Sequence, residues 1–108
     1  MTRLISHMYE TARWVVGMTC TEGTYINKER IIMGDCSGPK SAQAVLLHPR
    51  VEIAVLETAR GGIIREGLAF DSCTVGLITN VSSDHLGISG IETVEQLARV
   101  KQVVVEAV

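Results

Sequence analysis

The sequence is poor in aromatic residues, with one Trp, one Phe and two Tyr among 108 residues. Its hydrophobic core must therefore be built from Val, Ile, Leu and Ala. Cysteine is also scarce, and Cys20, Cys36 and Cys73 form no C-x-x-C pair. This pattern argues against a disulfide framework or a zinc cage and favours reduced thiols in the cytosol.

Long apolar runs and strong charge of either sign are absent as well. No stretch approaches the roughly 20 apolar residues of a membrane span, and no basic-then-apolar leader opens the chain. The formal charge of −2 gives no electrostatic reason to expect a nucleic acid or an anionic membrane as partner. Hydrophobic residues make up 46% of the chain and charged residues 20%. We therefore predict one soluble, cytoplasmic domain over residues 1–108.

Neither common phosphate-binding motif, G-x-x-x-x-G-K-[S/T] or G-x-G-x-x-G, occurs in the sequence. The chain instead opens on a helical pattern, whereas nucleotide-binding α/β folds place a strand and a glycine-rich turn before their first helix. Two interpretations remain open. Either the domain binds no nucleotide, or its phosphate loop lies just upstream of Met1, and we favour the second.

Helical and strand-like patterns alternate along the chain, which predicts a parallel, doubly wound, three-layer α/β sheet. Thr93 and Gln96, three residues apart, predict a capping box at the start of the last helix. The predicted helices span residues 2–12, 39–47, 62–68 and 94–107. The predicted strands span residues 14–18, 51–56 and 75–79, with a small hairpin formed by 25–27 and 30–33 around Lys28 and Glu29.

Glu57 directly follows the apolar run at 51–56 and precedes the glycine pair Gly61-Gly62. A carboxylate at the C-terminal end of a parallel strand lies where open α/β sheets bind ligands. We therefore treat Glu57 as a candidate metal ligand, with an exposed loop acid as the alternative. The glycines either allow a ligand to approach the backbone closely or merely open the next helix.

The predicted strand 75–79 ends in T-N-V-S-S-D-H-L and would bring Asn80, Asp84 and His85 to the same edge. A carboxylate suits Mg²⁺ or Mn²⁺, while an imidazole prefers softer ions. His85 is therefore a second candidate metal ligand beside Glu57. Asn80 either orients a substrate carbonyl or amide or satisfies a turn.

Lys101 lies on the apolar face of the last predicted helix, at i+4 from Leu97 and i+3 from Ala98. A lysine on such a face is unusual. Its ammonium either escapes along the helix to solvent or sits in a partly dry pocket, where it can react as a neutral amine. Thr21 and Arg60 could also contact a substrate. Alternatively, Thr21 only forms part of a turn and Arg60 is a solvated surface charge.

Several long motifs together resemble the Mur ligase family, in its central ATPase domain. They are G-M-T-C-T-E-G-T-Y-I, G-D-C-S-G-P, V-L-E-T-A-R-G-G-I-I-R-E-G-L, T-N-V-S-S-D-H-L-G and A-R-V-K-Q-V-V-V-E-A-V. The resemblance covers essentially the whole chain. It implies a nucleotide-binding-like α/β fold that, in this sequence, is truncated before its first strand and its phosphate loop.

The resemblance also implies roles for the matching residues. Glu57 and His85 would bind the two Mg²⁺ ions, or Mn²⁺, that bridge the ATP phosphates and the substrate. Lys101 matches the family lysine that is carbamylated in many members and then helps to hold the second ion. Thr21, Arg60, Gly61, Gly62 and Asn80 match positions that line the substrate cleft.

The implied reaction is ATP-dependent amide formation, in which a carboxylate becomes an acyl phosphate that an amino-acid amine attacks. The motifs most resemble the members that add arginine to the side-chain carboxylates of poly-aspartate, and a homo-oligomer is compatible with them. Relatives that act on folylpolyglutamate or peptidoglycan precursors are the alternative within the family. Outside enzymes, the alternative is an interaction domain that lost its phosphate loop. We expect the 108-residue chain alone not to turn over.

Overall fold

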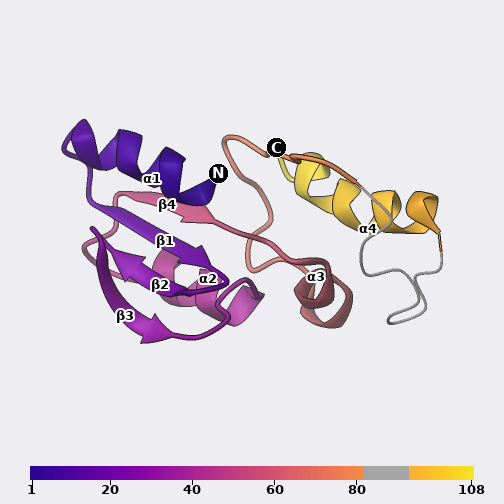
Figure 1. Cartoon of the computed structure of the whole chain (residues 1–108), viewed down its shortest axis with the longest axis horizontal. Coiled ribbons are helices and arrows are strands. Elements are labelled where there is room, and N and C mark those ends of the chain that lie inside the picture. The colour runs from indigo at the N-terminus through magenta and orange to yellow at the C-terminus, as the bar shows by residue number, and fades with distance from the viewer. Residues whose placement is uncertain (82–92) are drawn as a thin grey trace.

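The computed structural model describes residues 1–81 and 93–108, except for the side chains of Arg60 and Arg65. Four helices and four strands lie in this part of the chain (Figure 1). In chain order they are α1 (Thr2–Thr11), β1 (Val16–Cys20), β2 (Gly23–Ile26), β3 (Glu29–Met33), α2 (Pro39–Leu46), β4 (Ile53–Leu56), α3 (Arg60–Glu66) and α4 (Val94–Glu106).

The four strands form one sheet in the order β3-β2-β1-β4, with helices on both faces. A Cβ atom at Gly17 would lie 2.5 Å from Cγ1 of Val45, so α2 packs directly on that face of β1. Met18, the next residue, points to the opposite face, which α1 covers. The predicted three-layer arrangement is therefore present in the described residues.

The sheet is mixed, which corrects the prediction of a parallel sheet, and the predicted hairpin is confirmed as β2 and β3. β1 and β4 are parallel, whereas β2 pairs antiparallel with both β1 and β3. The connections between these antiparallel strands contain two residues each, Thr21-Glu22 and Asn27-Lys28. Turns this short can join only antiparallel neighbours, since a parallel pair needs a long crossover. Asn27 and Lys28 both have positive φ, as a type I′ turn requires, so the hairpin turns one residue earlier than predicted.

The predicted strand at residues 75–79 is wrong. This segment carries no strand pairing and instead lies against α4, where a Cβ atom at Gly76 would be 2.8 Å from the carbonyl oxygen of Val104. Cys73 N–H donates to the Ala107 carbonyl at 2.7 Å and fixes the start of the segment to the end of α4. An apolar run becomes a strand only when a neighbouring strand pairs with it, and here a helix supplies the contact instead.

The helices follow their predicted boundaries within two residues. The residues that begin and end each helix explain this agreement. Pro39 occupies the first turn of α2, where its missing N–H costs nothing. The capping box of α4 is confirmed: Gln96 N–H donates to Thr93 Oγ1 at 3.1 Å, and Thr93 N–H donates to Gln96 Oε1 at 3.2 Å. α1 ends where Trp14 N–H donates back to the Tyr9 carbonyl, with Arg13 in the left-handed conformation at a φ of 70°.

α1 departs from the usual burial of an amphipathic helix. Two of its large apolar side chains, Leu4 and Met8, are 56% and 62% exposed. The core instead centres on β1 and α2, with Val16 and Val45 fully buried, and α4, which packs on α3, contributes the buried Leu97. Among the described residues, no helix combines the length and the apolar character that crossing a membrane would require.

Candidate functional site

The two parallel strands end at the same edge of the sheet, and the candidate residues there follow them directly. Thr21 comes after β1, and Glu57 comes after β4. Glu57 N–H donates to the Thr19 carbonyl at 3.1 Å, which extends the β1–β4 pairing to the start of the loop. The Thr21 side chain is exposed and that of Glu57 half-buried. The edge predicted from the sequence is thus present and carries both residues.

The loop between β3 and α2 closes over this edge. Cys36 N–H donates to the Cys20 carbonyl at 3.0 Å, and the Ser37 carbonyl accepts from Ala59 N–H at 3.2 Å. Asp35 Oδ1 in turn accepts from both the backbone N–H and the hydroxyl of Ser37, at 3.0 and 2.6 Å. The loop is therefore bonded to the end of β1 and to Ala59, the residue before α3, which places it beside the segment that follows Glu57.

A shallow hollow lies where this loop meets the segments on either side of α3. It is lined by Ser37, Gly38, Pro39, Ala42, Glu57, Thr58, Gly67, Leu68, Ala69 and Phe70. Three of these residues, Glu57, Ser37 and Thr58, have oxygen atoms in their side chains. Oxygen ligands of this kind fit a hard divalent cation such as Mg²⁺. Within residues 1–81 and 93–108, no three His, Cys, Asp or Glu side chains gather into a metal-binding group.

The glycine pair lies inside the first turn of α3, which begins at Arg60. A Cβ atom at Gly62 would lie 3.2 Å from the Gly38 Cα and 3.3 Å from Pro39 Cδ. Gly62 therefore allows α3 to pack tightly on the loop that borders the hollow. Gly61 is half-buried beside it. The close approach that Gly62 allows is therefore to Gly38 and Pro39 of the same chain.

The remaining predicted residues lie farther along the chain. Asn80 is exposed at the end of the segment that lies against α4, and His85, with Asp84, falls outside the described residues. Lys101 is half-buried on α4, four residues after the buried Leu97. α3 packs on α4, but the lining of the hollow at Glu57 includes no residue of α4. The structure therefore brings Thr21 and Glu57 to one edge and places Lys101 on a separate element (Figure 1).

The sequence did not predict most of the residues that line the hollow. Residues 67–70 border it, although the pattern gave them no role beyond the end of a helix. Ser37 could have been found, because Pro39 at the start of α2 forces the preceding residue into an extended conformation and directs the chain across the strand ends. Nothing in the sequence of residues 67–70 indicated that they would line a site.

The Mur ligase middle domain is the family that matches this chain, over residues 1–108. Among curated proteins, the chain is 53% identical to the cyanophycin synthetase of Synechocystis sp. over 107 residues. It is 55% identical to that of Crocosphaera subtropica and 52% identical to that of Geminocystis herdmanii, again over 107 residues. Each match covers 99% of this chain but only 12% of the relative, so the chain spans about an eighth of the length of these proteins.

Proposed function

Because the chain belongs to the Mur ligase middle-domain family, we propose that it supplies the ATPase portion of an ATP-dependent ligase of the cyanophycin synthetase type. The ligase would form amide bonds between arginine and the side-chain carboxylates of poly-aspartate. The observation that carries the proposal is Glu57, which follows β4 at the edge where β1 and β4 both end. Identity above 50% to three cyanophycin synthetases supports this substrate class over the folate and peptidoglycan alternatives.

In the proposed mechanism, Glu57 and His85 would hold the two Mg²⁺ ions, and Lys101, as its carbamate, would help to hold the second. The chemistry that bound Mg²⁺ would supply there is neutralisation of the phosphate charge. Thr21 would contact the substrate at the same edge. The Ser37 loop would support Glu57, because its backbone is bonded to Cys20 at the end of β1 and to Ala59, two residues after Glu57.

The proposal is tested by replacing the matching 107 residues of the Synechocystis enzyme with those of this chain. We expect the chimera to incorporate arginine into a poly-aspartate primer in the presence of ATP and Mg²⁺. Glu57→Gln in the chimera should lower the rate at least about 100-fold, because even residues that only support metal ligands cost 10- to 100-fold when removed.

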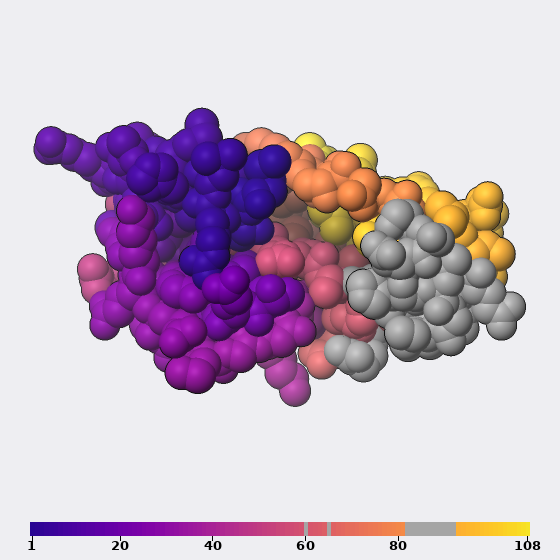
Figure 2. All heavy atoms as spheres, viewed as in Figure 1, coloured from indigo at the N-terminus to yellow at the C-terminus, as the bar shows by residue number. Residues whose placement is uncertain are grey.

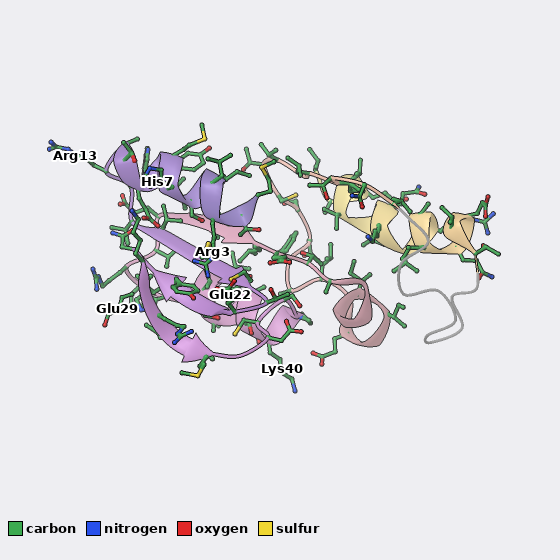
Figure 3. The ribbon with its side chains drawn as sticks, viewed as in Figure 1. Arg3, His7, Arg13, Glu22, Glu29 and Lys40 are labelled. Carbon is green, nitrogen blue, oxygen red and sulfur yellow. The ribbon has the colours of Figure 1, made fainter. Side chains whose placement is uncertain are left out.

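The matched control is Glu29→Gln, since Glu29 is an exposed carboxylate on β3, far from the strand ends that carry Glu57 (Figure 3). It should leave the rate unchanged. A folded chimera without ligase activity would contradict the proposal. So would a Glu57→Gln chimera that works as well as its parent.

A further inference from the structure

A groove between α1 and the β2–β3 hairpin lies apart from the strand ends. It has a volume of about 260 Å³ and is lined by Arg3, Ser6, His7, Glu10, Met18, Tyr25 and Lys28. The four α1 residues are spaced at i, i+3, i+4 and i+7, so they form one polar stripe along the helix. The volume is slightly smaller than that of pockets for drug-sized molecules, which suits a ligand of the size of one amino acid.

One end of the groove is held rigid by Arg3. Its guanidinium pairs with Glu22, donates to Tyr25 Oη at 3.2 Å and lies 5.1 Å from the centre of the Tyr25 ring. Figure 3 shows Arg3 and Glu22 pointing toward each other. These contacts raise the pKa of Arg3 above its ordinary value, chiefly through the hydrogen bond with Tyr25. Because Glu22 already balances its charge, we treat Arg3 as a lining residue of the groove and not as a binding site for a ligand anion.

The middle of the groove contains two polar groups that are poorly satisfied. Ser6 is 3% exposed, and its hydroxyl has no hydrogen-bond partner among the described residues. The Glu10 side chain, one turn further on, is only 13% exposed. Its carboxylate lies 3.7 Å from Lys28 Nζ, within ion-pair range but beyond a hydrogen bond. A buried hydroxyl and a buried carboxylate at i and i+4 can both accept from a single ammonium group.

Lys28 supplies the complementary charge. It is the second residue of the hairpin turn, its side chain is largely exposed, and its ammonium also donates to His7 Nδ1 at 3.3 Å. Neither of its partners holds it through a short, charge-assisted hydrogen bond. Lys28 is thus free to leave Glu10 for another anion at the mouth of the groove.

We propose that this groove binds the zwitterionic backbone of a free α-amino acid. The ligand's ammonium group donates to Glu10 and to Ser6 Oγ, and its carboxylate takes Lys28 from Glu10. The Tyr25 ring and the Met18 side chain provide the apolar floor. This site lies on α1 and the hairpin, involves none of the residues assigned to the ligase reaction, and does not depend on the proposed function.

The test is titration of the ¹⁵N-labelled chain with L-alanine, followed by NMR. We expect shifts in the Ser6, His7 and Glu10 amides that saturate in the millimolar range. N-acetyl-alanine lacks the ammonium and alaninamide lacks the carboxylate, so neither should reproduce the saturating shifts. Equal binding of either blocked compound, or no shifts with alanine, would overturn the proposal.

The variants Ser6→Ala and Glu10→Gln should each weaken alanine binding about tenfold, since Ser6→Ala removes a hydrogen bond to the ammonium group and Glu10→Gln removes the negative charge that strengthens the other. Glu29→Gln is the matched control, because Glu29 is exposed and contributes nothing to the groove. Thermal melting confirms that each variant folds. Wild-type affinity in both folded groove variants would also refute the site.

Discussion

Thr19 and Thr24 are paired across β1 and β2, and both are completely buried. Their hydroxyls find no hydrogen-bond partner among the described residues. A buried hydroxyl without a partner costs about 1–3 kcal/mol. We therefore predict that Thr19→Val raises the free energy of unfolding by about 1 kcal/mol, measured by urea denaturation. Thr21→Val, at an exposed position, should change little. Destabilisation by Thr19→Val would instead indicate that the two hydroxyls hold an internal water.

At the same scale, the sequence predicted where Glu57 lies but not what surrounds it. The position followed from the apolar run of β4, because strand ends can be located from hydrophobic patterns. The lining residues 67–70 come from a loop whose path depends on packing against the rest of the chain. The half-burial of Lys101 agrees with its place on an otherwise apolar helix face, whereas its carbamylation stays a prediction.

Among the elements, the end of α1 offers the clearest opportunity to change stability. Arg13 occupies the left-handed position after the helix, which favours glycine because a Cβ atom is crowded there. We predict that Arg13→Gly raises the free energy of unfolding by about 0.5 kcal/mol, after the greater flexibility of glycine in the unfolded chain is subtracted. Figure 3 shows the Arg13 side chain extending away from the molecule, so no packing is lost.

The matched control is Arg13→Ala, which keeps the crowded Cβ atom and should leave stability unchanged. Differential scanning calorimetry of the two variants measures the effect. A glycine variant that melts below the alanine variant would contradict the assigned helix end.

The helices and strands also show which sequence patterns were sufficient to predict an element. The capping box of α4 and the proline of α2 are local, so residues a few positions apart fixed both helix starts. The segment at 75–79 has a convincing strand composition, yet strand formation depends on a partner that local sequence does not reveal. The β2–β3 hairpin was predicted from local residues, whereas the antiparallel pairing of β2 with β1 was not.

At the scale of the whole molecule, burial is uneven. β1 is buried along its entire length and lies between β2 and β4, whereas α4 buries only Leu97 well. Figure 2 shows the start of α4, in orange-yellow, at the end of the molecule away from the indigo atoms of α1. Backbone amides exchange with solvent through local opening, which is easiest where few apolar contacts are lost.

We therefore predict that hydrogen exchange, followed by mass spectrometry, is slowest in β1 and at least about tenfold faster in α4. Peptides covering β1 and α4 provide the comparison within one sample. Equal protection of both elements would show that the described part of the chain opens only as one cooperative unit.

The position of β3 at the margin of the sheet has a practical consequence for handling the protein. Among residues 1–81 and 93–108, no strand pairs with its outer side, where Ile31, Ile32 and Met33 are all substantially exposed. Such a margin can recruit the same strand from a second molecule and seed aggregation. Glu29 and Arg30 place charge at its beginning, and the irregular pairing near Thr24 and Tyr25 distorts it. Colloidal stability at high concentration therefore depends on these few residues more than on the net charge of the molecule.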